Sequence, residues 1–170
     1  MLKILGAVLL TSGAAAFGFS AAGHLNRRVN SLRAILGALA LMDRELSFRL
    51  TPTPELLALL AKRAQAPACH FFARCTSGLD HLGEQSLCQI WHTALVSYPM
   101  DLSSEDCCTL EELGEVLGRY DGPGQRAALA EIHTRLNHSL ANAEEERGRM
   151  GRVYGALGLT IGSFLAVLLL

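Results

Sequence analysis

Residues 4–23 read ILGAVLLTSGAAAFGFSAAG, residues 153–170 read VYGALGLTIGSFLAVLLL, and neither run contains a charged side chain. A helix needs about 20 apolar residues to span the hydrocarbon core of a membrane. The first run meets this length, and the second is at its short limit. The sequence therefore predicts two transmembrane helices, over residues 2–23 and 153–170, with a domain of residues 24–152 between them.

A cleavable signal peptide is the alternative interpretation of the first run. Lys3 precedes the run, and the small residues 20–22 are suited to cleavage. Arg27 and Arg28 follow immediately, however, and positive charge just past an apolar segment opposes its translocation. This charge favours a retained anchor over a signal peptide and over a soluble helical protein released by cleavage.

The arginines beside the two runs also predict the orientation of the chain. Positive residues are enriched on the cytoplasmic side of membrane helices. Here all but Lys3 lie toward the middle domain: Arg27, Arg28 and Arg33 after the first run, and Arg147, Arg149 and Arg152 before the second. We therefore expect a cytoplasmic middle domain in a bacterial cell membrane. The odd number of cysteines agrees, because it does not resemble the disulfide framework of a secreted domain.

Small residues recur at three- and four-residue steps along both apolar segments. In membranes such residues let two helices approach closely. We therefore expect the two predicted helices to pack as a hairpin, although glycine is also common in membrane helices that make no specific contact. The residues concerned are Gly155, Gly158 and Gly162 in the second run with Gly151 just before it, and Ala14, Gly18 and Ala22 in the first run.

The middle domain has helical periodicity almost throughout. Apolar residues recur every three or four positions from Leu32 to Leu50, and similar stripes follow in five later segments. Two start signals stand out: Thr53 before Pro54 as an N-cap, and Ser103 with Asp106 as an approximate capping box. No stretch alternates like a strand. The fold class expected is all-α, a bundle of about six helices between two transmembrane helices.

Signatures of catalysis are missing from the sequence. Residues 122–124 form a Gly-Pro-Gly turn without the Gly-Lys-Ser/Thr ending of a phosphate-binding loop, and the cysteines and histidines of residues 69–81 match no common zinc spacing. A net charge of −1 excludes a strongly basic nucleic-acid binder. We expect no enzyme, cofactor, metal or small-molecule substrate. The alternative is a thiol-based redox sensor or enzyme that uses Cys107 and Cys108, whose pKa a helix start would lower; otherwise the cysteines are expected to be buried apolar residues.

Polar residues at two places are candidates for contact with a partner protein. They are Asp43 and Glu45 beside the apolar face of the first helix, and Arg119, Asp121 and Gln125 at the Gly-Pro-Gly corner. An aspartate at such a corner also commonly caps the following helix, so a purely structural role stays open for Asp121.

Three stretches of the middle domain carry a resemblance to a known family: residues 39–46 (LALMDREL), residues 53–57 (TPELL), and Ser86-Leu87 with Trp91 and Ala94-Leu95. The chain resembles the stage III sporulation protein AB family of endospore-forming bacteria, and the resemblance extends over essentially the full length of the chain. Its most specific part is Leu117-Gly118-Arg119-Tyr120-Asp121 with Gln125, which looks like the family's Leu-Gly-x-x-Asp-x-x-x-Gln signature. Pro52 and the short Gly-Pro-Gly corner are unusual for the family, but neither touches these motifs.

This resemblance implies a function that the residues alone do not reveal. The family's soluble domain is similar to that of the F-component platform of type II secretion and type IV pilus systems. The resemblance implies a non-enzymatic scaffold in the mother-cell membrane facing the forespore. Its implied partners are the lipid bilayer, a secretion-type cytoplasmic ATPase of the same sporulation complex, and other membrane components of that channel.

Overall fold

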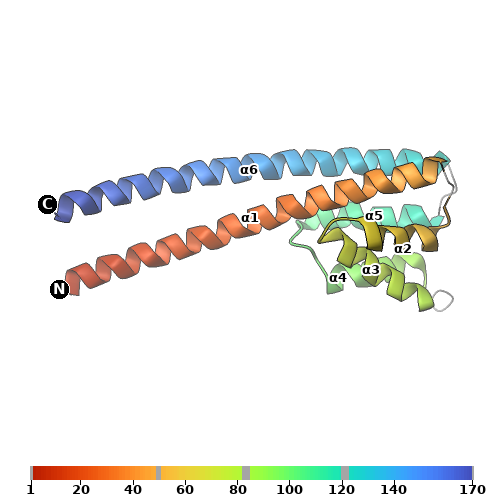
Figure 1. Ribbon diagram of the computed structural model, residues 1–170, viewed down its shortest axis with the longest axis horizontal. Coiled ribbons are helices and arrows are strands. Elements are labelled where there is room, and N and C mark those ends of the chain that lie inside the picture. Colours follow the sequence, from red (N-terminus) through yellow and green to blue (C-terminus); the bar gives the residue numbers. More distant parts are fainter. Residues whose placement is uncertain (1, 49–50, 82–84, 120–122, 170) are drawn as a thin grey trace. The chain divides into compact units, whose positions relative to one another are not determined.

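The computed structural model describes residues 2–48, 51–81, 85–119 and 123–169, and gives the backbone alone for 2–22, 81, 118–119, 123, 152 and 154–169. The prediction of an all-α bundle of about six helices is confirmed within these residues, where no strand occurs (Figure 1). The elements are α1 (Leu2–Phe48), α2 (Thr53–Arg63), α3 (Ala68–Gly78), the short 3-10 helix η1 (Leu79–His81), α4 (Leu87–Ser97), α5 (Ser104–Arg119) and α6 (Pro123–Leu169).

The chain divides into two compact units. The helical bundle comprises residues Arg27–Ala141, and the end unit comprises α1 up to Asn26 and α6 from Asn142. Inside the end unit, Arg147 Nη1 donates a hydrogen bond to Asn26 Oδ1 at 3.1 Å, which links α6 to α1.

The predicted membrane segments fall almost wholly outside the residues whose side chains are described. Among those that are described, no helical stretch is long and apolar enough to cross a membrane. Gly151 is exposed, and no described atom lies within 4 Å of a Cβ placed on it. The other six small residues of the expected hairpin, from Ala14 to Gly162, lie where the backbone alone is described. The hairpin, the two membrane segments and the 24–152 boundaries stay predictions.

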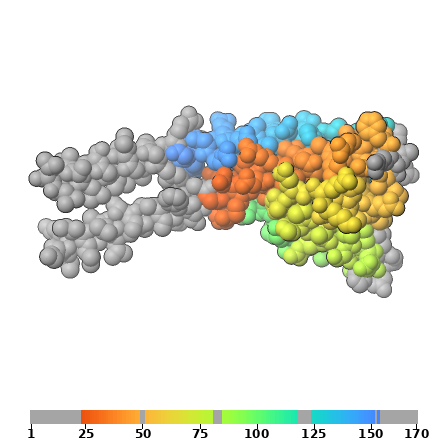
Figure 2. All heavy atoms as spheres, in the orientation of Figure 1, coloured from red at the N-terminus to blue at the C-terminus, as the bar shows by residue number. Residues whose placement is uncertain are grey.

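The core of the bundle follows the predicted apolar stripes. On α1, side chains at helical spacing from Leu32 to Met42 are buried, whereas Leu46 is half-buried and Phe48 exposed. On α5 the apolar stripe predicts a buried face of Leu110, Leu113, Val116 and Leu117; the three leucines are buried, whereas Val116 is half-buried. The surface formed by α1, α2 and α3 on one side of the bundle is seen in Figure 2. Burial of these stripes is the main stabilising term of such a bundle.

Trp91 of α4 is the centre of the contact between α3, α4 and α5. Its ring is 1% exposed and meets Phe71 edge to face, with 5.0 Å between the ring centroids. Its Nε1 donates to the Leu110 carbonyl oxygen at 2.7 Å, so its polar atom is satisfied in the core. Gly114 allows this approach, because a Cβ there would lie 2.6 Å from Trp91 Cγ. One aromatic side chain of α4 therefore contacts both α3 and α5.

The helix starts confirm one predicted cap and correct another. Ser103 and Asp106 form the predicted capping box of α5: Ser103 N donates to Asp106 Oδ2 at 3.1 Å, and Asp106 N donates to Ser103 Oγ at 3.2 Å. The N-cap prediction for Thr53 is wrong by one residue. Extended Pro52 caps α2, because its carbonyl oxygen accepts the first helical bond from Leu56 N at 2.9 Å.

Candidate functional site

The predicted contact residues on α1 differ in accessibility. Asp43 is exposed, so its carboxylate is available to a partner. Glu45 is only 5% exposed and its side chain lies within the bundle. Of this pair, Asp43 is the one that remains suited to surface contact, and its role in binding stays a prediction.

Gln125 has a structural contact at the corner between α5 and α6. It is 8% exposed, and its Nε2 donates to the Leu117 carbonyl oxygen at 3.3 Å. This bond satisfies a carbonyl near the end of α5, where helical partners run out. Asp121 lies outside the described residues, and the Arg119 side chain is not described either. A partner role for this corner therefore stays a prediction.

The structure brings together a cluster that the sequence analysis did not assemble. We call Arg27 and Arg28 of α1, Asp101 of the α4–α5 loop, and Ser103 and Asp106 at the start of α5 the charged clasp. Its central contact runs from Arg28 Nε to Asp106 Oδ2 at 3.0 Å, and Arg28 Nη2 also donates to Ser103 Oγ at 3.3 Å. Residues about 75 positions apart in sequence are thus tied by one guanidinium group.

Asp106 is the buried anion of the charged clasp. Its side chain is 0% exposed, whereas that of Arg28 is 21% exposed. Burial alone raises the pKa of Asp106, but hydrogen bonds from Ser103, Arg28 and Ser139 outweigh it and hold the pKa below its ordinary value. Asp106 therefore stays ionised at neutral pH, and Arg28 supplies the counter-charge that a buried carboxylate requires.

The outer half of the charged clasp includes an unusual turn. Met100 and Asp101 have φ angles of 55° and 54°, and Leu102 N donates to the Pro99 carbonyl oxygen at 3.2 Å. Left-handed conformations cost non-glycine residues roughly 1–2 kcal/mol each. Two contacts offset that cost here: Met100 is buried, and Asp101 accepts a hydrogen bond from Arg27 Nε at 3.2 Å. Strain held in place by tertiary contacts is a mark of functional positions.

The thiol alternative receives no support from the geometry. Burial, followed by the negative charge of Asp106, raises the pKa of Cys107, so the expected lowering of its pKa by a helix start is wrong. Burial raises the pKa of Cys75 to about 12. The expectation of buried cysteines holds for Cys75, but Cys88 and Cys108 are exposed. Among the described residues, no group of three or more potential ligands is placed to hold a metal ion.

Comparison with known proteins agrees with the all-helical bundle. The model of the family described as stage III sporulation protein AB matches residues 3–170. The chain belongs to the stage III sporulation protein AB family. A curated family member from Bacillus subtilis (strain 168) is 28% identical over 177 aligned positions, which cover all of both chains.

A solved structure of a stage III sporulation protein AB (SpoIIIAB) has the same fold. It superimposes with a TM-score of 0.64 at 26% identity and covers 72% of this chain and 98% of its own. The resemblance found in the sequence motifs is thereby confirmed at the level of the family. The stage III sporulation protein AB family is one of sporulation proteins, which makes a component of a sporulation complex the functional class of this chain.

Proposed function

We propose that this protein is a non-enzymatic membrane platform of the channel complex between mother cell and forespore. Its bundle would lie in the mother-cell cytoplasm and couple a secretion-type ATPase to the membrane channel. The observation that carries the membrane part is the position of the two uncharged runs. They occupy the ends of α1 and α6, and these ends belong to one compact unit joined by the Arg147–Asn26 bond.

The charged clasp supports the coupling part of the proposal. It fixes α5 to α1, and α1 is the same helix whose first part carries the uncharged run. A load applied to α5 is therefore passed directly to a helix that enters the end unit. Surface ion pairs contribute little to such a contact, but a buried pair with several hydrogen bonds resists separation.

Thiol labelling in protoplasts tests the membrane and orientation parts. Cys88 and Cys108 are exposed on the bundle, so a maleimide that cannot cross membranes reports the side on which the bundle lies. We expect the full chain to stay in the pellet after carbonate extraction, and these thiols to react only after the cells are opened. The matched control is the Cys88→Ser, Cys108→Ser variant, which should lose the signal. Labelling of these thiols in intact protoplasts would show that the bundle lies on the opposite side of the membrane. Release of the protein by carbonate would show that the chain is not anchored in the membrane.

Capture from sporulating cells tests the coupling to an ATPase. Tagged full chain should recover a secretion-type ATPase, and Asp43→Arg with Asp121→Arg should lower the recovery about tenfold if these residues meet it. Asn137→Arg is the control, because Asn137 is exposed and lies on α6 away from both positions in sequence. Equal recovery by both variants would remove Asp43 and Asp121 from the interface. Recovery of no ATPase by the wild type would exclude the coupling role.

A further inference from the structure

One exposed surface of the bundle is acidic. Glu112 and Glu115 of α5 and Glu131 of α6 line a groove of about 450 Å³ between these two helices. The apolar side chains of Val116 and Ile132 also line it. We call this the acidic groove; it combines negative charge with apolar contact area.

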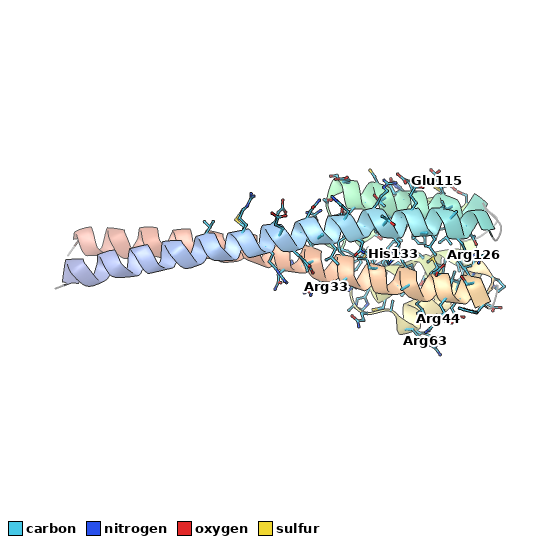
Figure 3. All side chains as sticks on the ribbon, turned by 90° about the horizontal axis from the view of Figure 1, so that it is seen from above. Arg33, Arg44, Arg63, Glu115, Arg126 and His133 are labelled. Carbon is cyan, nitrogen blue, oxygen red and sulfur yellow. The ribbon has the colours of Figure 1, made fainter. Side chains whose placement is uncertain are left out.

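A second exposed surface is basic. Arg44 near the end of α1 and Lys62 and Arg63 in the last turn of α2 are all exposed. We call these three residues the basic edge. Figure 3 shows Arg44 and Arg63 at one margin of the bundle and Glu115 at the opposite margin. The acidic groove and the basic edge therefore lie at different margins of the bundle.

Among the described residues, most charges of the two surfaces have no ion-pair partner. Arg135 forms a bidentate ion pair with Glu112, and its pKa is raised by that hydrogen bond and by the nearby charges of Glu112 and Glu131. Arg135 thus pairs with one carboxylate of the acidic groove, Glu112, and lies near a second, Glu131. Glu115 and Glu131 form no ion pair with any described residue, and within the same residues none joins a member of the basic edge to an acid.

We propose that the acidic groove of one copy of this chain binds the basic edge of a second copy. The two surfaces have opposite charge, and each copy carries one acidic groove and one basic edge. The basic edge of one copy is therefore matched in charge to the acidic groove of the next. Because they lie at opposite margins, one copy does not satisfy both by itself. The contact is head to tail, which generates a ring if its rotation closes and a row if it does not.

The acidic groove favours a second copy over an unrelated basic protein because every copy already carries the complementary surface, the basic edge. Basic side chains long enough to enter a groove, such as Arg44 and Arg63, carry both the charge and an aliphatic stem for the apolar lining. Charge complementarity of this kind sets register and suppresses wrong partners more than it adds affinity. The contact should therefore be sensitive to salt between about 0.05 and 0.5 M.

A charge-swap experiment with full-length chain in mild detergent tests the contact. One variant carries Glu115→Lys with Glu131→Lys, and the other carries Arg44→Glu with Arg63→Glu. Each variant has two surfaces of the same sign, so we expect its self-association in sedimentation velocity to fall about tenfold or more. An equimolar mixture of the two variants should associate again, because every surface then meets its opposite.

Controls separate this contact from misfolding and from other partners. Arg126→Glu changes an exposed charge outside both surfaces and should associate like wild type. The unfolding midpoint of each variant, followed by Trp91 fluorescence, should match that of wild type. A wild-type chain that stays monomeric at low salt overturns the proposal, as does a mixture that fails to recover association. Recovery of a basic protein of another sequence on the acidic groove, in place of a second copy, also overturns it.

Discussion

The starts of α4 and α5 use the same capping device with different consequences. At α4, Ser86 N bonds Gln89 Oε1 at 2.9 Å and Gln89 N bonds Ser86 Oγ at 3.3 Å. At α5 the corresponding pair is Ser103 and Asp106. The first box is exposed and local, whereas the second is part-buried and joined to Arg28 of α1. Exchanging the amide for a carboxylate thus turns a local cap into a tertiary link.

The difference is a matter of charge and burial. The exposed amide of Gln89 is hydrated on its outer side and needs no partner from another helix. The carboxylate of Asp106 is removed from water, and an ionised group in that position is stable only if it is paired and hydrogen-bonded. Arg28 therefore stabilises the start of α5, and a substitution of Arg28 or Asp106 affects both α1 and α5.

The largest effect that distinguishes the two helix starts is expected from alanine at the second capping position. Asp106→Ala removes the cap and the buried carboxylate that pairs with Arg28, so the free energy of unfolding should fall by about 3 kcal/mol. Gln89→Ala should cost only about 0.5 kcal/mol. Urea unfolding followed by the fluorescence of Trp91, the single tryptophan, measures both. Equal losses in the two variants would show that the link to Arg28 adds nothing.

Substitutions of the N-cap serines test the same difference between the starts of α4 and α5. Ser103→Ala should lower the free energy of unfolding by about 1.5 kcal/mol, since Ser103 both caps α5 and accepts a bond from Arg28. Ser86→Ala loses a cap alone and should cost about 1 kcal/mol or less. The same urea titrations test this ordering. A larger loss at Ser86 than at Ser103 would contradict the added role of the Arg28 contact.

Acid should weaken the start of α5 selectively. The folded-state pKa of Asp106 is lowered from its ordinary 3.8, so its stabilisation is fully present above that pH. It is lost as the pH falls through the lower pKa of the folded state. The stability of wild type should therefore decrease more steeply below pH 3.8 than that of Asp106→Asn. Parallel curves for the two proteins, measured by thermal unfolding at several pH values, would show that Asp106 is not the group that titrates.

The features that were predicted correctly from the sequence are those that depend on residues close together in the chain. The Ser103–Asp106 box was visible because capping acts over three residues, and the six helices were visible because apolar residues repeat at helical spacing. The role of Arg28 was not visible, because its partner is 78 residues away. Arg28 follows an apolar run, which suggested membrane orientation as its role. Gln125 was ambiguous in a similar way. The sequence suggested contact with a partner, whereas its side chain bonds the Leu117 carbonyl oxygen inside the fold.

The smallest effect is expected at the outer half of the charged clasp. Asp101→Asn keeps a residue type that tolerates a φ angle of 54° and removes only the charge that faces Arg27. Because the Arg27 side chain is 53% exposed and that of Asp101 36%, the pair is screened by water, and its loss should cost less than about 0.5 kcal/mol. Asp101→Val is the matched contrast, since a β-branched residue in this left-handed turn should cost several times more. If asparagine costs as much as valine, the ion pair and not the backbone holds the turn, and the two halves of the clasp act as one charged network.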